Sequence, residues 1–500
     1  MTRRLPDHID GYGPVRPFRA RPVDKASKRR AQVPLFDSID AVVDTLDLRD
    51  GATISFHHHL RDGDDVMRAV VDVLAARGLR DLHVAASSIF PVHAPLVPHI
   101  RSGVITRIST AYVAGPVARA ISAGELRHPA VLQTHGGRAR AIATGALPID
   151  VAFVAAPSAD RHGNLSGAIG PSACGPLGYA MVDARYARRV VAVTDNLLDD
   201  RLASIDIAGN EVDAVVAVPS IGDPTRIVSG TTRITDDPVS LRIAAMAARA
   251  IDASGLLVDG FSFQTGAGGT SLAVAADVAA IMRQKGIKGS FAAGGITGTL
   301  VEMFHEGLFE RLYDVQCFDL AAVASYRTDA AHQAMSASLY ADPGRRDAVA
   351  GRLDVMILGA AEVDTAFNVN VTAVGGGKII GGAGGHADTA AGAKLTIITT
   401  RLSAKDNPKI VRDVECVTTP GATVDVVVTE AGIAVNPLRA DLIARFADAG
   451  LRLVTIEELA NVACEQTGWT SEKFQTSGNK VVAVVEYFDG TVTDVIRQSG

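Results

Sequence analysis

The sequence predicts an α/β protein made of two tandem, related α/β domains with mostly parallel sheets. Three observations predict this fold: an internal repeat, short apolar runs that alternate with helical stretches, and the chain length of 500 residues. A chain of this length that is 47% hydrophobic and only 21% charged can bury more than one core.

The internal repeat has a constant offset of 204 positions. Residues 150–164 align with residues 354–368, and Asp, Val, Ala, Asp and Asn recur in register. The same offset pairs the apolar residues at 96–97 with those at 300–301. Self-similarity of this kind indicates a repeated structural unit. We therefore expect a basic N-terminal extension over residues 1–35, a first domain over 36–236 and a second domain over 237–500.

The apolar runs are short and uninterrupted, as in strands that are buried on both faces. They lie at 151–155 and 190–193 in the first copy and at 355–358 and 395–399 in the second. Helical stretches such as 64–77 and 272–284 separate them. Buried strands that alternate with helices predict parallel sheets, in which ligands bind at the carboxyl ends of the strands.

Composition excludes several functional classes. The formal net charge of −6 gives no overall electrostatic reason to bind nucleic acid or an anionic membrane. The four cysteines are far apart and form no CxxC pair, so neither a zinc knuckle nor a disulfide framework is predicted. No apolar run of about 18 residues occurs. We expect a cytoplasmic protein, whose basic extension is either a solvated segment or an arm for an acidic partner.

Three glycine clusters follow predicted strands in the second copy. They span 264–271, 291–298 and 375–388, and none matches a dinucleotide or nucleoside triphosphate motif. Their backbone N–H groups can approach an anion or an oxyanion closely, although tight turns explain such clusters as well. We expect Gly294 and Gly295 to act in catalysis, and Thr265, Gly266, Gly268, Gly269, Gly384 and Gly385 to bind a phosphate-bearing thioester.

The first copy carries polar residues after its strands instead. His57 and His59 share one face of an extended strand, whereas His58 points the other way. Imidazole and guanidinium groups suit a polycarboxylate, so His57, His59, Arg61, His135 and Arg138 are predicted to bind substrate. The alternative is that the histidines cap strands. No metal site is predicted, because no cysteine lies nearby and no HxxxH spacing occurs.

A third set of candidates follows the strand at 355–358. Glu362 is a candidate nucleophile, and Asn368 and Asn370 are candidate thioester-binding residues. Asp364 and Asn368 have counterparts in Asp160 and Asn164, which favours a structural turn in both copies.

Long segments of the chain are similar to a known family. ISFHHHLRDGD at 54–64, GFSFQTGAGGTSLAVA at 260–275 and FNVNVTAVGGGKIIGGAGGHADTAAGAKL at 367–395 resemble the citrate lyase α subunit, a citrate CoA-transferase. The resemblance covers nearly the whole chain. It implies a CoA-transferase-like fold and the reaction of acetyl-[acyl carrier] with citrate to give acetate and citryl-[acyl carrier].

The resemblance also implies partners and a mechanism. The partners are an acyl carrier (γ) subunit that bears a CoA-like prosthetic group, a citryl lyase (β) subunit and further copies of this chain, with no covalently bound cofactor on the chain itself. Many related CoA-transferases use a glutamate nucleophile, but Gly294 stands at that position here. This departure implies direct attack by citrate through a mixed anhydride. A citramalate CoA-transferase and a non-catalytic CoA-binding regulator are the alternatives.

Overall fold

The computed structural model describes residues 8–9, 13–14, 33–228, 232–468 and 478–499. It divides into two units, residues 1–31 and 32–500. In the first unit, β1 (His8–Ile9) and β2 (Gly13–Pro14) pair as antiparallel strands. The basic side chains of the predicted extension lie outside the described residues. All further description concerns the second unit.

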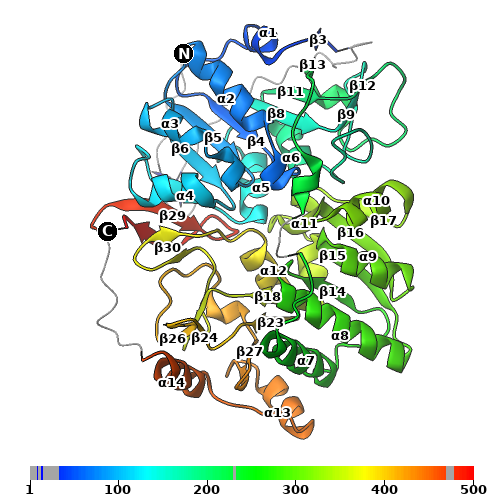
Figure 1. The fold of residues 1–500 in the computed structure, drawn as a ribbon, viewed down its shortest axis with the longest axis vertical. Coiled ribbons are helices and arrows are strands. Elements are labelled where there is room, and N and C mark those ends of the chain that lie inside the picture. The colour runs from blue at the N-terminus through cyan, green and yellow to red at the C-terminus, as the bar shows by residue number, and fades with distance from the viewer. Residues whose placement is uncertain (1–7, 10–12, 15–32, 229–231, 469–477, 500) are drawn as a thin grey trace. The chain divides into compact units, whose positions relative to one another are not determined.

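The second unit contains two large sheets (Figure 1). The ten-stranded sheet has the order β3 (Leu35–Phe36), β13 (Ala214–Ala217), β11 (Arg189–Thr194), β8 (Val151–Ala156), β4 (Thr53–Phe56), β5 (Leu82–Ala86), β6 (Ile105–Thr110), β7 (Ala130–Leu132), β29 (Val481–Glu486) and β30 (Val492–Arg497). The eight-stranded sheet has the order β17 (His332–Ala334), β16 (Phe309–Cys317), β15 (Gly289–Ile296), β14 (Ser262–Thr265), β18 (Val355–Gly359), β23 (Leu395–Thr399), β27 (Val426–Thr429) and β28 (Gly432–Val435). Only the β29–β30 and β27–β28 pairs in them are antiparallel.

The two sheets repeat one topology. The strand order β13-β11-β8-β4-β5-β6-β7 in the first sheet corresponds to β27-β23-β18-β14-β15-β16-β17 in the second. The predicted equivalence of the strands that follow Asp150 and Asp354, which are β8 and β18, is therefore confirmed. Both strands are buried on both faces: in β18, Val355 and Ile357 pack into the main core, and Met356 and Leu358 pack into a second cluster.

Helices and short strands connect the elements of the two sheets. The helices are α1 (Ile39–Val43), α2 (Val66–Ala76), α3 (Leu96–Arg101), α4 (Gly115–Ser122), α5 (His135–Thr144), α6 (Gly178–Tyr186), α7 (Pro238–Ala253), α8 (Gly269–Lys285), α9 (Gly298–His305), α10 (Leu320–Thr328), α11 (Ala337–Ala341), α12 (His386–Gly392), α13 (Ala440–Asp448) and α14 (Ile456–Thr467). The short strands are β9 (Ser158–Asp160), β10 (Leu165–Ser166), β12 (Leu197–Leu198), β19 (Glu362–Asp364), β20 (Val369–Asn370), β21 (Ala373–Val374), β22 (Lys378–Ile379), β24 (Ser403–Ala404), β25 (Asn407–Pro408) and β26 (Ile410–Val411). None of the described helices is long and apolar enough to cross a membrane.

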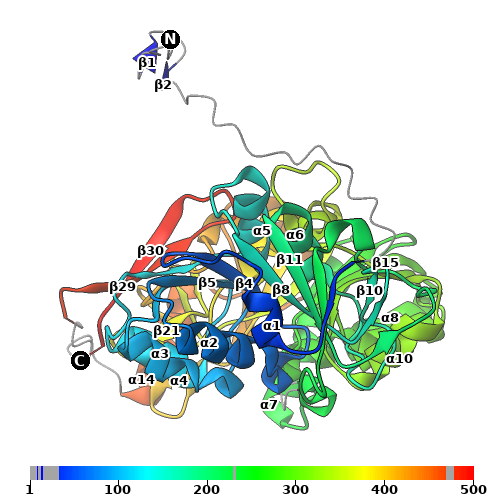
Figure 2. The same cartoon turned by 90° about the horizontal axis from the view of Figure 1, so that it is seen from above.

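The C-terminal strands depart from the predicted division at 236/237. β29 pairs in parallel with β7 of the first sheet, with Ala483 opposite Ala130, and β30 follows at the edge. Figure 2 shows this red hairpin at the edge of the first sheet, beyond the strands coloured blue to cyan. The predicted second domain, 237–500, includes residues 481–497, but their buried side chains, such as Val482 and Val485, complete the first sheet.

A polar turn recurs in both halves. Asp160 accepts hydrogen bonds from the backbone N–H groups of His162, Asn164 and Leu202 and from the Asn164 amide. Asp364 accepts the corresponding bonds from Ala366, Asn368 and Val414 and from the Asn368 amide. Each asparagine in turn accepts from a glycine N–H, Gly209 in one half and Gly421 in the other. The turn is therefore structural, and the Asn368 side chain is used within the protein.

Candidate functional site

The carboxyl ends of strands from both sheets meet inside the second unit. Gln316, near the end of β16, donates from Nε2 to the His58 carbonyl oxygen just after β4, at 2.8 Å. The His135 N–H after β7 donates to the Gly384 carbonyl oxygen at 2.7 Å. Residues far apart in the sequence are thereby joined at the edge where parallel strands place their ligands.

The histidines after β4 divide between two faces, as predicted. His57 and His59 contact each other through their Nδ1 atoms, and His59 Nε2 accepts from the Tyr179 N–H at 3.4 Å. His58 lies on the other side, where its Nδ1 is 2.6 Å from Ser87 Oγ. Burial lowers the pKa of His57 to about 4 and holds the pKa of His58 and of His59 well below the usual value. All three are neutral imidazoles at pH 7.

His58 belongs to a cluster of rings that the sequence did not single out. Its ring centroid lies 4.6 Å from Tyr179, 5.7 Å from His135 and 5.9 Å from Phe90. His58 is therefore better placed than His57 and His59 to meet a ligand beside His135.

The second half of the chain fixes His135. Thr134 caps α5 by accepting from the Gly137 N–H, and Asp388 accepts from Thr134 Oγ1 at 2.7 Å and from the Gly136 N–H at 3.0 Å. Burial raises the pKa of Asp388 to about 7. His135 Nδ1 is buried without a protein partner, and burial lowers the pKa of this imidazole to about 3.

Arg61 is the cation of the cluster. Its guanidinium carbon lies 4.6 Å from the ring centre of Phe318 and 5.5 Å from that of Phe90. The Nε atom is buried without a partner, and burial lowers the pKa of the side chain. A guanidinium that is partly desolvated and unpaired is suited to bind an anionic ligand.

Arg138 is not available in the way the sequence suggested. Both of its terminal nitrogens bond to the Asp183 carboxylate, at 2.8 and 2.9 Å, and one also donates to the Ala85 carbonyl oxygen. Arg138 and Asp183 are only 3% and 2% exposed. The predicted carboxylate partner is thus a buried aspartate of the protein, and Arg138 supports the strand end that precedes Ser87.

Gly294 and Gly295 lie where the β15 strand leaves regular pairing. A β-bulge separates them, and Gly294 has φ +104°. A Cβ on Gly294 would overlap the Gln264 side chain, and one on Gly295 would overlap the Phe318 ring. Gln264 Nε2 donates to the Tyr340 hydroxyl at 2.8 Å, while Gln264 Oε1 is buried and unpartnered. These glycines keep space around Gln264 and Arg61 that side chains would fill.

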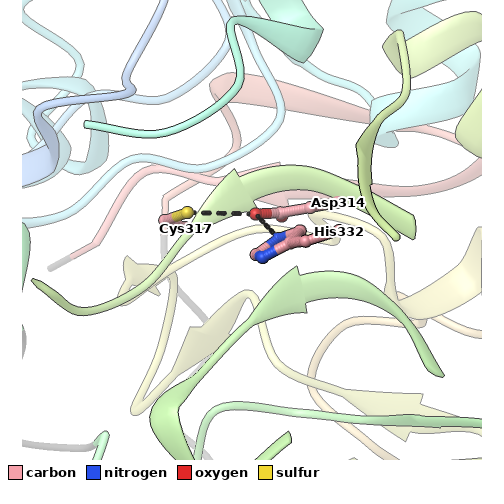
Figure 3. A group of neighbouring side chains, drawn as sticks. All are labelled: Asp314, Cys317 and His332. Carbon is pink, nitrogen blue, oxygen red and sulfur yellow. Dashed lines mark hydrogen bonds and ion pairs between the residues drawn. The ribbon is translucent and has the colours of Figure 1, made fainter. Parts of the chain in front are cut away.

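Three buried side chains form a separate group (Figure 3). Asp314 Oδ2 lies 3.1 Å from Cys317 Sγ and 3.1 Å from His332 Nε2, and His332 Nδ1 lies 3.0 Å from Ser325 Oγ. Such residue types can hold a metal ion. Here each already bonds to a neighbour inside the core, which accounts for the group as a hydrogen-bonded element between β16 and β17.

Comparison with known proteins decides the family. The family model described as citrate lyase, alpha subunit (CitF) matches residues 32–499. The citrate lyase alpha chain of Klebsiella pneumoniae is 44% identical over 99% of this chain and 96% of its own length. That of Escherichia coli K12 is 45% identical over 90% and 88%. The chain belongs to the citrate lyase alpha subunit family.

Solved structures agree with this assignment. A Streptococcus mutans structure described as the alpha subunit of citrate lyase in complex with citrate has a TM-score of 0.92 and 45% identity, covering 94% of this chain and 92% of that one. A Pseudomonas malonate decarboxylase in complex with malonate has a TM-score of 0.66 at 18% identity, covering 86% and 85%, and shares the fold. As a citrate lyase alpha subunit, the chain is an enzyme, the transferase component of citrate lyase.

Two predicted parts of the citrate lyase site lie apart from the ring cluster. Glu362 accepts from the Asn370 amide at 2.7 Å and from the Glu415 N–H at 3.1 Å, and burial raises its pKa. Asn370 is fully buried and also donates to the Ala373 carbonyl oxygen. No described contact joins this network to His58 or His135. Glu362 and Asn370 are therefore engaged locally, which weakens their predicted roles.

The glycine loops differ in how closely other atoms pack against their glycines. Gly266 and Gly268 face open or loosely packed space, whereas Gly269 packs against the Arg233 carbonyl oxygen. Thr265 Oγ1 donates to the Ser271 carbonyl oxygen at 3.0 Å, so it holds the loop. In the third loop, Gly384 lies beside His135, and Gly385 packs on the Tyr340 hydroxyl. Among the loop glycines, Gly384 of this third loop is the one that lies against His135.

Several cluster residues were missed by the sequence analysis: His58, Ser87, Phe90, Tyr179, Gln264, Gln316, Phe318 and Tyr340. One available signal was position, because Ser87, Gln264 and Gln316 lie at or just after strand ends. Tyr179 and Tyr340 carried no such signal, since they reach the site from α6 and α11.

Proposed function

We propose that this chain transfers the acyl carrier thiol from acetate to citrate by direct attack of a citrate carboxylate on the acetyl thioester. The observation that supports this route is a group of buried, unpartnered polar atoms around the ring cluster, none of which belongs to a carboxylate. Those atoms are Arg61 Nε, His135 Nδ1, Gln264 Oε1 and Gln316 Oε1. Native proteins rarely leave so many polar atoms unsatisfied in one region unless a ligand or water completes them.

The chemistry needs no nucleophile from the protein. A citrate oxygen attacks the thioester carbon, the tetrahedral intermediate expels the thiolate, and an acetic–citric anhydride remains. The thiolate then attacks the citryl carbonyl of that anhydride, and acetate leaves. Holding the two reactants in place can by itself lower such a barrier by about 7–11 kcal/mol.

The residues divide these tasks by chemistry. Arg61, His58 and His135 provide a cation and two neutral imidazoles for the carboxylates of citrate. The bulge at Gly294 and Gly295 interrupts the strand pairing, and an interrupted ladder leaves N–H groups for an oxyanion. His57 and His59 support His58 from behind.

The same proposal includes the setting of the reaction. The chain acts in the cytoplasm with further copies of itself, an acyl carrier (γ) subunit and a citryl lyase (β) subunit. The thioester is carried on the CoA-like prosthetic group of the carrier, which approaches the loops at 264–271 and 375–388. The carrier arm is a substrate of this chain.

One assay tests the activity. The purified chain is mixed with acetyl-CoA and either citrate or citramalate, and the acyl-CoA products are identified by mass spectrometry. We expect citryl-CoA and no citramalyl-CoA. Citramalyl-CoA as the main product would establish the citramalate enzyme instead, and the absence of any product, also with the carrier present, would contradict the proposal.

A trapping experiment tests the mechanism. The chain is incubated with acetyl-CoA alone, treated with borohydride and digested. We expect no reduced glutamate. A modified peptide that contains Glu362 would overturn direct attack, because a glutamyl thioester is the species that borohydride reduces to an alcohol.

A further inference from the structure

A cavity lies near the ring cluster, between the two halves of the chain. It has a volume of about 510 Å³ and is lined by residues of α4, of β22 and of the C-terminal segment: Gly115, Arg119, Ser122, Lys378, Ile379, Ile380 and Ser499. The Ile379 N–H donates to Ser122 Oγ at 2.9 Å, and the Ser499 N–H donates to the Ser122 carbonyl oxygen. The walls are thus fixed to one another around Ser122.

Among the described residues that line this cavity, the charged ones are both cations, Arg119 and Lys378. Neither has an ion pair or a side-chain hydrogen bond with any described residue. Many other arginines of the surface are paired, as Arg101 is with Glu125 beside the same helix. Both side chains are exposed, and two unpaired cations that line one cavity fit an anion with several oxygen atoms.

The cavity shares two walls with the ring cluster. Gly115 packs against Pro91, and the ring of the preceding Phe90 lies at a tilt against His58 and Tyr112. On the other side, four residues lead from Ile380 to Gly384, which lies beside His135. Four residues of extended chain span at most about 14 Å. One ligand can therefore reach both places, with its anionic group at one end and its reacting group at the other.

We propose that Arg119 and Lys378 bind the phosphates of the thioester arm whose acyl end reacts beside His58 and His135. This inference rests on the proposed function and deepens it, since it names the subsite that recognises the nucleotide end of the donor. The phosphates can come from free CoA or from the prosthetic group of the carrier, and the chemistry of recognition is the same.

The test combines a charge reversal with two donors. In the double variant Arg119→Glu, Lys378→Glu, we expect the KM for acetyl-CoA to rise about 10-fold or more, as the loss of two charge-assisted hydrogen bonds requires. The KM for citrate and the value of kcat at saturating acetyl-CoA stay unchanged. With acetyl-pantetheine, which has no phosphate, the variant and the native chain behave alike. Lys405→Glu, on the β24–β25 turn, is the matched control.

Two outcomes would overturn the subsite. One is an unchanged KM for acetyl-CoA in a double variant with the native thermal midpoint, and the other is an equal loss with acetyl-pantetheine. A binding measurement tests the subsite even if the proposed transferase activity is wrong, because it needs no turnover. Calorimetry measures the affinity for CoA, and pantetheine serves as the control. The native chain binds CoA more tightly than pantetheine, and the double variant does not.

Carrier binding distinguishes the sources. We expect the double variant to lose affinity for the carrier with its prosthetic group and to keep its affinity for the carrier without it. An equal loss of affinity for both forms of the carrier would show that Arg119 and Lys378 bind acidic side chains on the carrier surface. That outcome would contradict the phosphate subsite.

Discussion

The two halves of the chain share the same polar turn but carry different residue types at the ends of their strands. Asp160 and Asp364 accept equivalent sets of four hydrogen bonds in loops that follow equivalent strands. At the strand ends, the first half presents imidazoles and an arginine, whereas the second half presents glycines and glutamines. Shared polar residues maintain the fold, and the residues that differ form the site.

We expect the largest effect, a loss of stability, from substitutions in the turn that both halves share. Asp160→Ala and Asp364→Ala should each lower the free energy of unfolding by about 3–5 kcal/mol, because several N–H donors lose their only acceptor. Urea denaturation of both variants measures this. Similar losses of stability in the two variants support the equivalence of the two turns. A loss in only one variant would contradict that equivalence. Thr491→Ala, at an exposed turn, provides the baseline.

The next largest effect is a loss of activity, expected from a substitution at a strand end that differs between the two halves. His58→Asn should lower kcat/KM for citryl-CoA formation about 100-fold, because an oriented ring nitrogen in the cluster is lost. His83→Gln is the matched control, since His83 bonds to Ser109 in the same half but lies outside the cluster. Equal activity of the two variants would show that His58 is merely a packed ring.

The histidines also make the first half sensitive to acid. Burial lowers the pKa of His57 and His83 to about 4 and that of His135 to about 3, whereas the second half has one such residue, His386. Between pH 6.5 and 4 the unfolded chain binds protons that the folded chain does not, so stability falls as the pH falls. Asp388, with its pKa raised to about 7, opposes this trend in part.

Urea denaturation at pH 7 and pH 5 measures the acid effect. We expect a net loss of about 5 kcal/mol at pH 5, because the four histidines each contribute about 2 kcal/mol and Asp388 returns about 2 kcal/mol. We expect His83→Gln to reduce that loss by up to about 2 kcal/mol. A stability that is equal at the two pH values, or a loss that His83→Gln leaves unchanged, would contradict the assignment of the sensitivity to buried histidines.

The smallest effect is expected at Glu362. Glu362→Gln should change kcat/KM by less than about 3-fold, because the carboxylate serves the Asn370 and Glu415 contacts, which an amide partly keeps. Steady-state assays with citrate and acetyl-CoA check this. Inactivation of a folded variant would make Glu362 a participant in the reaction and would place chemistry in the second half.

Patterns along the chain were sufficient to predict the α/β fold, the parallel sheets and the duplication, because periodic burial and a fixed offset are properties of the sequence itself. The same holds for the opposite faces of His57 and His58, since side chains alternate along an extended strand. The family resemblance also rested on contiguous strings, and the comparisons confirmed it.

Only the tertiary structure decided which polar residues are free. Arg138 pairs with Asp183 at a separation of 45 positions, and Gln316 bonds to His58 at a separation of 258. The C-terminal hairpin returns to the first sheet from the far end of the chain. Contacts at such separations depend on how sheets and helices pack, and burial then determines whether a charge meets another side chain or remains for a ligand.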